Sequence, residues 1–576
     1  QFFSEINFIK NENGLDDLDL SVVYDKLSKL KHLEFKIYNA QGQLVKTFKE
    51  KDFKDTSLAD GYSILTDNRM KYLNPSHFQY PFFSKFDYEI EQENTIFISP
   101  FRPITSSNDR IMEATYQLTY PQSFTINRNE KNFDSFKIET SETPNAITYK
   151  VKNLKAPEWE DFNVRYFDLI PYARFSNTTF GLGEVKGTAH TWNEFGVWYY
   201  EHFLKGLNKL PESTISKMKD LTRNASNDIE KAKIIFEYVQ NNTRYISIQV
   251  GLGGWRPFPA NEVDKLGYGD CKALTNYTKS LLEAVGVTSY YTIIHASNNV
   301  TDIDDKSIGL QGNHVILTLP TKEGNLFLEC TSQRIPFGFI GTSTLNRKAL
   351  AIKPGGAEFV TTYPYNENQN VLKGAFTVDL SNIQKVKSRI QFENQGVFYY
   401  DIFSLNKSDK EEIDLYVKNL FSKIKGLTVL NYQSTNDKEA YVIKEDINVE
   451  SSFIGSKIGN DYMIAVNSFL PLSSLPKKYK NRKTNFAISR GKTYQLKTEY
   501  ILPKDMVYTF VPESKNIESD FGKHLVKFEH SDGKLIVEET FVLKSGTYSK
   551  EKYDDYVQFI LDVTQSSNSK IILTKN

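Results

Sequence analysis

The sequence predicts an α+β fold in which a mixed core lies between two β-rich domains. Three observations predict it. The chain has 576 residues, enough for roughly three or four domains of ordinary size. Both ends of the sequence show the two-residue alternation of strands, whereas the middle also shows the three- and four-residue spacing of amphipathic helices. The composition, 39% apolar and 14% aromatic, is typical of folded, β-rich proteins.

Residues 1–165 are predicted to form the first β-rich domain. Apolar residues alternate with polar ones before a turn at 39–42 and again at 86–90, which is a sandwich-like signal. The alternating positions are Leu33, Phe35 and Ile37, then Phe86, Tyr88 and Ile90. From Ala156 to about Pro211 the sequence is rich in aromatic residues without a long period, and we interpret this segment as a packed connector.

Residues 166–365 are predicted to form the core. One helix begins near Asn227 and ends at 241–242, and a strand follows from Arg244 to Val250. A second helix begins at about Cys271 and stops at Gly286. Three further strands are expected at 289–295, 314–319 and 326–330, the last two joined by a turn.

Residues 366–576 are predicted to form a second β-rich domain that contains two helices. The first helix carries a capping box, with Ser408 as N-cap and Glu411 three residues later, and ends at Gly426. The second helix is expected at about 550–563. A hairpin is expected around 531–533.

Charge and hydropathy exclude several classes of partner. The 71 basic and 71 acidic residues cancel, so we expect no nucleic acid partner, which would need a broad positive field. No apolar run approaches the roughly 20 residues that span a bilayer, so no transmembrane segment is expected. The chain begins with Gln, which fits a removed signal peptide as well as a start inside a longer protein. Two cysteines are too few for disulfides to hold this fold together.

Cys271 stands where the second core helix begins, in YGDCKALTNYTKSLLEAVG (268–286). A helix N-terminus offers unpaired amides and a partial positive charge, which favour thiolate over thiol. The neighbouring carboxylate of Asp270 would oppose a second negative charge unless it caps the helix, and we expect it to do so. The simpler interpretation stays open, because free cysteines are among the most buried residues.

His314 and Glu329 are candidates for a base and its orienting carboxylate. His314 opens one predicted strand, in QGNHVILTLP, and Glu329 lies on the next, in LFLECTSQ. If the two strands form a hairpin with an even-numbered loop, His314 and Glu329 share a face and Cys330 points away from it. A cysteine nucleophile needs such a base. Each residue alone is more simply a satisfied polar group, but their conjunction favours chemistry.

Metal and nucleotide chemistry are not indicated. The sequence has no His-Glu-x-x-His pattern, no paired-cysteine motif and no clustered Asp/Asn loop of the calcium-binding kind. Its glycine-rich stretches do not match a dinucleotide-binding or phosphate-binding loop. We therefore expect neither a metal nor another cofactor.

The chain resembles exported proteins of Gram-negative bacteria that carry a transglutaminase-like core between two β-rich domains of unknown function. In the core, the resemblance rests on VQNNTRYISIQVGLGGWRPFPA, YGDCKAL, NHVIL and LFLECTSQ. KIYNAQGQLVKTFKEKDFKDTS, DNRMKYL and FDYEIEQENTIFISPFRP resemble the N-terminal domain, and NFAISRGKTYQLKTEYILP resembles the C-terminal one. The resemblance implies a papain/transglutaminase-like catalytic core flanked by two β-sandwich-like domains. It also implies a location in the periplasm or on the outer cell surface.

The superfamily uses a Cys, His, Asp triad, which carries over as Cys271, His314 and Glu329. Glu in place of Asp is a departure that moves the carboxylate by one methylene. The implied activity is that of a cysteine-dependent acyl-enzyme hydrolase or transferase acting on amide bonds of a protein or peptide. Trp255 and Tyr268 precede the nucleophile and are candidate positioning or oxyanion-binding residues, although each is more simply a packing aromatic.

The alternative hypothesis is a silent scaffold whose β-rich domains bind a protein or a cell-envelope polymer. The state of Cys271 discriminates between the two. An exposed, reactive Cys271 in a cleft favours the enzyme, whereas a buried Cys271, or a disulfide with Cys330, favours the scaffold.

Overall fold

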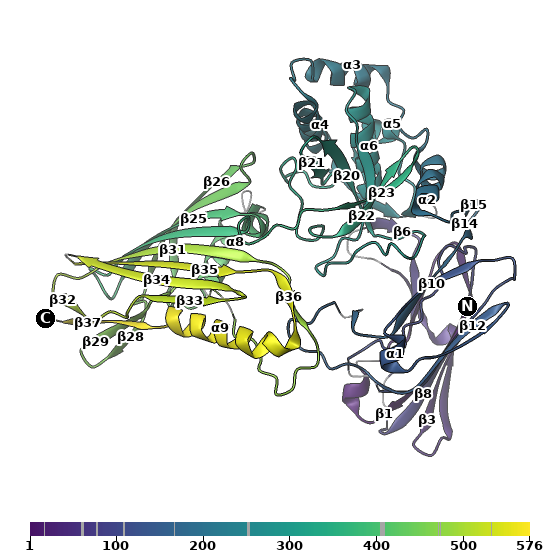
Figure 1. The fold of residues 1–576 in the computed structure, drawn as a ribbon, viewed down its shortest axis with the longest axis horizontal. Coiled ribbons are helices and arrows are strands. Elements are labelled where there is room, and N and C mark those ends of the chain that lie inside the picture. The colour runs from purple at the N-terminus through teal and green to yellow at the C-terminus, as the bar shows by residue number, and fades with distance from the viewer. Residues whose placement is uncertain are drawn as a thin grey trace.

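The computed structural model describes residues 1–15, 18–58, 63–75, 79–107, 110–165, 168–249, 254–403, 409–469, 472, 474–531 and 533–575. An N-terminal β unit, a mixed unit and a C-terminal β unit lie at the corners of a triangle (Figure 1). The predicted α+β class, with helices and many β-sheets, is therefore confirmed. Among the described residues, no helix is long and apolar enough to cross a bilayer.

The N-terminal unit is built from small antiparallel sheets. The predicted alternation is confirmed: Phe35 and Phe86 face each other on neighbouring strands and are buried. The largest sheet has the order β1-β8-β3-β4. The elements are β1 Phe2–Ile9, η1 Glu12–Leu15, β2 Ser21–Tyr24, β3 Ser28–Asn39, β4 Leu44–Lys49, η2 Glu50–Asp52, β5 Lys54–Ser57, β6 Ser63–Thr66, β7 Arg69–Tyr72, β8 Phe82–Gln92, β9 Arg110–Thr119, β10 Ile126–Lys131, α1 Phe133–Phe136, β11 Glu139–Thr143, β12 Ala146–Lys155 and β13 Tyr172–Asn177.

The aromatic-rich connector contributes to two units. Its first strand, β13, pairs with β10, and Phe175 belongs to the hydrophobic cluster of the N-terminal unit. Its later elements pack against the core sheet, with Tyr199 and Trp198 buried. These elements are β14 Thr179–Leu182, β15 Val185–Thr188, α2 Trp192–Tyr199, the π-helical turn η4 Tyr200–Leu204 and α3 Glu212–Leu221. Tyr166 and Phe167 lie outside the described residues.

The core contains a five-stranded antiparallel sheet in the order β21-β20-β19-β22-β23. The two predicted helices are present as α4 and α6, and Asn227 caps the first of them. The predicted strand from Arg244 is divided into two short strands, and Val250 lies outside the described residues. The elements are α4 Asp228–Asn242, β16 Arg244–Tyr245, β17 Ser247–Gln249, α5 Ala260–Leu266, β18 Tyr268–Gly269, α6 Cys271–Ala284, β19 Tyr290–Ile294, β20 His314–Thr321, β21 Gly324–Leu328, β22 Lys348–Lys353 and β23 Gly356–Thr361.

The C-terminal unit is an eight-stranded sheet, β26-β27-β25-β24-β31-β35-β34-β33, with a mixed second layer. The apolar faces of α8 and α9 share one hydrophobic cluster with this sheet and with the sheet β28-β29-β37-β32. The two helices predicted for this domain are present as α8 and α9. Because of them the second layer is partly helical and departs from the β-sandwich that the resemblance implies. The elements are β24 Val371–Asp379, β25 Val386–Gln395, α7 Val397–Ile402, α8 Lys410–Leu420, β26 Thr428–Asp437, β27 Val442–Ser451, β28 Ser456–Ile458, β29 Asp461–Ala465, β30 Phe486–Ile488, β31 Lys492–Ile501, β32 Met506–Phe510, β33 Lys515–Ser519, β34 Gly522–Ser531, β35 Lys534–Leu543, β36 Gly546–Tyr548, η7 Lys550–Lys552, α9 Tyr553–Ser567 and β37 Lys570–Lys575.

Two local predictions in this unit have different outcomes. The hairpin is confirmed, because β34 pairs with β35 from Gly522 to Ser531. Asp532, named in that prediction, lies outside the described residues. The capping prediction for α8 is wrong by one residue. Asp409 is the N-cap and accepts from the Glu412 amide at 2.9 Å, and the helix ends at Leu420, before Gly426. Ser408 lies outside the described residues. Ser and Asp are both good N-cap residues and are neighbours here, so the sequence alone does not show which of the two begins the helix.

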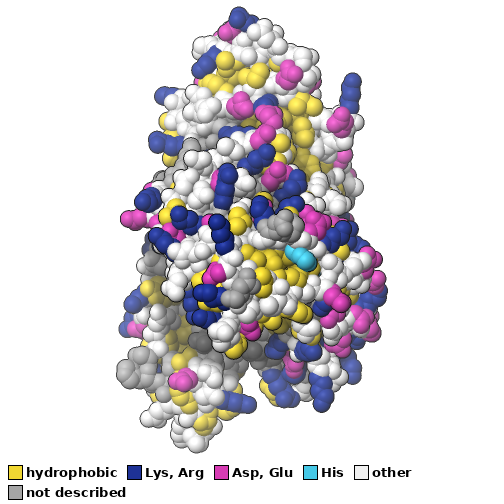
Figure 2. Space-filling model, turned by 90° about the vertical axis from the view of Figure 1, so that its left-hand side faces the viewer, with side chains coloured by type: hydrophobic (Ala, Val, Ile, Leu, Met, Phe, Trp, Pro, Cys, Tyr) yellow, Lys and Arg dark blue, Asp and Glu magenta, His cyan; other side chains and the backbone are white. Residues whose placement is uncertain are grey.

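The end of the C-terminal unit is visible in Figure 2, where Lys and Arg side chains are interspersed with Asp and Glu. Hydrophobic side chains gather among them on this face. The strands at this end carry exposed Ile458, Val507 and Phe510. On the face in view, basic and acidic side chains are therefore mixed and do not form separate patches.

Candidate functional site

Cys271 is the first residue of α6, which packs across the five-stranded sheet. Asp270 is the N-cap: its Oδ1 accepts from the Ala273 amide at 2.9 Å, and its Oδ2 lies 2.5 Å from Lys272 Nζ. The expected capping role of Asp270 is therefore present, and Lys272 balances its charge. The objection that a neighbouring carboxylate would repel a thiolate is weakened accordingly.

His314 and Glu329 lie together beside this helix end. β20 and β21 form the predicted hairpin, in which Thr321 pairs with Gly324 and Leu317 with Leu328. His314 Nε2 lies 2.8 Å from Glu329 Oε2, and the other ring nitrogen is left for a second partner. The His314 side chain is within hydrogen-bonding reach of Cys271. The structure thus brings Cys271, His314 and Glu329 into one chain of contacts.

Thr331 fixes the second oxygen of the Glu329 carboxylate. Glu329 Oε1 accepts from the Thr331 hydroxyl at 2.5 Å and from its amide at 3.2 Å. Sequence reasoning missed Thr331. The predicted strand 326–330 ends at Leu328, so Glu329 and Thr331 lie in the turn region beyond β21, where the two-residue period of a strand gives no signal.

His314 and Glu329 each stabilise the charged form of the other. Burial opposes protonation of His314, but the Glu329 carboxylate and the hydrogen bond to Cys271 outweigh it, so the pKa of His314 is raised well above its usual value. Burial acts against ionisation of Glu329 as well, yet His314 and Thr331 keep the pKa of Glu329 below its usual value. An imidazolium–carboxylate pair is therefore the favoured state near neutral pH.

The two cysteines have different environments. Both are free and buried, and Cys271 is 4% exposed. Cys330 belongs to the hydrophobic cluster beneath α6, and burial raises the pKa of Cys330 to about 12. Cys330 is thus an inert packing residue, and no disulfide joins it to Cys271.

Aromatic side chains surround the nucleophile. Tyr199 and Tyr291 belong to the same buried cluster as Cys271, and Trp255 packs against that cluster. The Tyr199 hydroxyl donates to the Trp255 carbonyl at 2.9 Å, and the Trp255 ring lies 5.4 Å from that of Phe97. Tyr268 is further removed: it lies in β18, paired with Arg244, outside this cluster. Tyr199 and Tyr291 come from distant parts of the sequence and carry no local signal.

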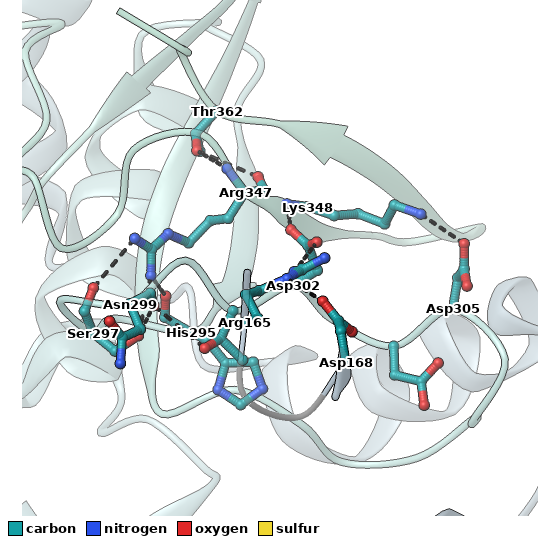
Figure 3. A network of polar contacts seen from close by, with 12 residues as sticks. Arg165, Asp168, His295, Ser297, Asn299, Asp302, Asp305, Arg347, Lys348 and Thr362 are labelled. Carbon is teal, nitrogen blue, oxygen red and sulfur yellow. Dashed lines mark hydrogen bonds and ion pairs between the residues drawn. The ribbon is translucent and has the colours of Figure 1, made fainter. Parts of the chain in front are cut away.

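The loop between β19 and β20, residues 295–313, leads into His314 and is held on one side by Arg347 (Figure 3). Arg347 is 1% exposed and donates to the carbonyls of His295 at 2.6 Å and Ser297 at 3.2 Å. Burial, together with Arg174 and Arg347, lowers the pKa of His295 to about 4. His295 is therefore neutral and can accept from the Gly312 amide at 3.3 Å.

On its other side the same loop is bound to the N-terminal unit. Asp302 accepts from Arg165 Nη1 at 2.8 Å and from the Lys348 amide at 2.8 Å (Figure 3). Asp304 accepts from Asn129 at 3.0 Å, and Gln311 accepts from Arg174 at 2.7 Å. The acidic side chains of this loop therefore accept hydrogen bonds from other residues of the protein. Within the described ranges, no group of three or more His, Cys, Asp or Glu residues is arranged to hold a metal ion.

Two family models match parts of the chain. Residues 5–158 match the family described as "Domain of Unknown Function with solved-structure structure (DUF3857)". Residues 460–573 match the one described in the same words as DUF3858. The matches lie in the N-terminal and C-terminal units and leave the core, with Cys271, His314 and Glu329, between them. Comparison with curated proteins gives no match.

Solved structures include a similar fold. A crystal structure of a proposed protease from Parabacteroides distasonis ATCC 8503 covers 100% of this chain and 95% of its own, with a TM-score of 0.63 and 12% identity. At that identity the likeness shows the fold alone. A proposed cysteine protease from Cytophaga hutchinsonii covers 57% of this chain and 79% of its own at 9% identity, but its TM-score of 0.18 is too low to support an argument.

Proposed function

We propose that the chain is a cysteine-dependent acyl-enzyme hydrolase or transferase with a transglutaminase-like core. The observation that carries the proposal is the contact chain from Cys271, at a helix N-terminus, through His314 to Glu329. Helix dipole, base and orienting carboxylate are the three parts that activate a cysteine nucleophile. The solved neighbour that shares the fold is itself described as a proposed protease.

In the proposed reaction the Cys271 thiolate attacks an amide carbonyl, so that a C–S bond forms and the carbonyl becomes a tetrahedral oxyanion. His314 holds the proton taken from the thiol and gives it to the amine as the C–N bond breaks. Water, or an amine, then attacks the thioester and releases the acyl group. The backbone amide of Cys271 is the proposed oxyanion donor, worth about 2–4 kcal/mol in comparable sites. Trp255 lines the site and Tyr268 is removed from it, so Trp255 is the better positioning candidate.

Protein or peptide is the proposed substrate, with hydrolysis favoured over amine transfer. The proposed location is the periplasm or the outer surface of a Gram-negative bacterium, on the resemblance to exported proteins. Both chemistries share the acyl-enzyme, so the contact chain supports them equally.

The silent scaffold remains the second candidate, because one observation favours it. Cys271 is 4% exposed, and a substrate carbonyl needs access to its sulfur. In this alternative the contact chain is structural and the β units bind a protein or an envelope polymer. An enzyme with this site would have to open before its substrate could enter.

Site-resolved iodoacetamide labelling between pH 5 and 9 tests the proposal. Wild type, His314→Ala and Cys330→Ala would be compared, with Cys271→Ala as the blank. The enzyme predicts that Cys271 labels fast near neutral pH and that His314→Ala removes this reactivity, whereas Cys330→Ala leaves it intact. If Cys271 labels only after unfolding, the scaffold is the better description.

A further inference from the structure

One buried polar group beside the nucleophile has no partner in the contacts described above. Tyr291 lies on β19 with its side chain fully buried. Among the described residues, its hydroxyl oxygen has no hydrogen-bond partner. Buried hydroxyl groups are nearly always paired, since an unpaired donor destabilises the fold. The exception here occurs at the wall of the candidate site.

Three groups lie around the Tyr291 hydroxyl and could accept its hydrogen bond: Asp270, Tyr199 and Cys271. Cys271 and Asp270 both interact electrostatically with its hydroxyl. Asp270, however, accepts from Ala273 and Lys272. The Tyr199 ring centroid lies 6.1 Å from that of Tyr291. The Tyr199 hydroxyl gives its own proton to Trp255 and interacts with the Tyr291 hydroxyl, but in this structure it does not accept a hydrogen bond from it. The sulfur of Cys271 is the candidate whose strength as an acceptor changes with its charge: a thiol is a weak acceptor, but a thiolate is a strong one.

We propose that the Tyr291 hydroxyl donates a hydrogen bond to the Cys271 sulfur when the thiol ionises, so that Tyr291 is a catalytic residue that stabilises the nucleophile. The proposal rests on the proposed function. The thiol proton passes to His314, and Tyr291 keeps its own proton throughout. Burial, followed by the nearby Tyr199 and Cys271, raises the pKa of Tyr291 well above its usual value, so the hydroxyl stays neutral and able to donate.

The other groups that face the thiol have separate roles. On its own helix, Lys272 balances the charge of Asp270. From β20, His314 takes the proton and Glu329 holds the resulting charge. From α2, Tyr199 directs its proton to the Trp255 carbonyl. Tyr291 adds a neutral donor that is unpaired beside the thiol and paired beside the thiolate, so it shifts the balance between these two states.

This role predicts opposite effects of Tyr291→Phe on stability and on ionisation. Removing an unpaired buried hydroxyl leaves the resting fold as stable as wild type, or more stable. Removing a donor to the thiolate moves the pH midpoint at which Cys271 ionises upward by about one unit, which is about tenfold less thiolate at a given pH below that midpoint. A packing residue would not produce this combination.

The full chain labelled with [3-13C]cysteine allows both effects to be measured. Its two cysteines give two resonances, which a Cys330→Ala variant assigns, and the readout needs no reagent to reach the buried sulfur. The matched control is Tyr277→Phe. Tyr277 is also buried on α6, but its hydroxyl donates to Asp264 at 2.6 Å, so this variant should lower the melting temperature and leave the midpoint of Cys271 unchanged.

An unchanged midpoint in Tyr291→Phe would overturn the inference, as would a loss of stability without a midpoint shift. The proposed function is judged separately, from the wild-type titration. An ordinary thiol midpoint in wild type would count against the proposed function. A difference between wild type and Tyr291→Phe would still support the contact between Tyr291 and the thiolate.

Discussion

His314 is the residue on which the charge of the site depends. Its imidazolium form is disfavoured by burial and favoured by Glu329 and Cys271. Because the carboxylate is the larger of the two favourable causes, the protonation of His314 near neutral pH depends on the third member of the contact chain. The extra methylene of Glu relative to Asp does not prevent a 2.8 Å contact.

Glu329→Gln should therefore lower the pKa of His314 and the reactivity of Cys271. The substitution keeps the side-chain size and removes the charge, and we expect a loss of at least about 100-fold in reactivity, as for other orienting carboxylates. Histidine NMR titration and the labelling rate of Cys271 measure the two effects. Glu329→Asp is the matched control, because it keeps the charge and should retain part of the reactivity.

The same pair makes a signed prediction about stability. The lowered pKa of Glu329 contributes stability that is present above its unfolded value and is lost as pH falls through the folded one. The raised pKa of His314 contributes stability that is present below its unfolded value and is lost as pH rises through the folded one. Wild type should thus exceed Glu329→Gln in unfolding free energy most clearly between about pH 4.5 and 6.5. A pH-independent difference would argue against an ion pair.

At the scale of elements, a buried carboxylate ties α8 to the eight-stranded sheet. Glu445 lies on the inner face of β27 and is 3% exposed. It accepts from Asn394 at 2.9 Å, from Tyr432 at 3.0 Å and from Tyr416 on α8 at 3.4 Å. Burial raises the pKa of Glu445 above its usual value despite these donors. The folded protein therefore favours the protonated acid.

Glu445→Gln should stabilise the C-terminal unit at high pH and have little effect at low pH. A raised folded pKa means that wild-type stability falls as pH rises from the unfolded value through the folded one. The neutral amide does not titrate, so the variant should melt a few degrees above wild type at pH 8, with a gain that shrinks at pH 4. Calorimetry at both pH values measures this. A loss of stability at pH 8 would show that the three donors need the charge.

Some features of the helices and strands could be predicted from local sequence rules, and others could not. The start of α6 at Cys271 and the hairpin that carries Glu329 towards His314 follow from local rules, a helix N-cap and two alternating strands joined by a turn. Glu329 itself lies just beyond the end of β21 at Leu328. The parallel pairing of β24 with β31 joins residues more than a hundred positions apart, and periodicity records which face is apolar but not which strand lies beside it. Tyr291 could not be predicted for the same reason, since its role depends on α6 crossing β19.

At the scale of the whole molecule, the segment after β12, residues 156–165, is hydrogen-bonded to the C-terminal unit. Glu160 is 4% exposed and accepts from the amides of Lys483 at 2.9 Å and Thr484 at 3.0 Å, and from the Thr484 hydroxyl at 2.6 Å. Beside it, the buried guanidinium of Arg482 lies 4.0 Å from the Tyr553 ring centroid. The N-terminal unit, which also holds the loop leading to His314, is thereby fixed to both other units.

Glu160→Ala should remove the hydrogen bonds that hold residues 156–165 to the C-terminal unit. It leaves the amides of Lys483 and Thr484 without their acceptor and the buried Arg482 charge without the carboxylate 4.0 Å away, at a cost of about 3–5 kcal/mol. We therefore expect the N-terminal unit to unfold separately from the other two. Calorimetry should then resolve two transitions, and limited proteolysis should cut the chain near residues 158–165. Glu158→Ala is the matched control: Glu158 forms an exposed ion pair with Lys155, and its removal should leave the stability close to that of wild type. A single cooperative transition in Glu160→Ala would show that the contacts of the N-terminal unit with the core suffice to hold the triangle together.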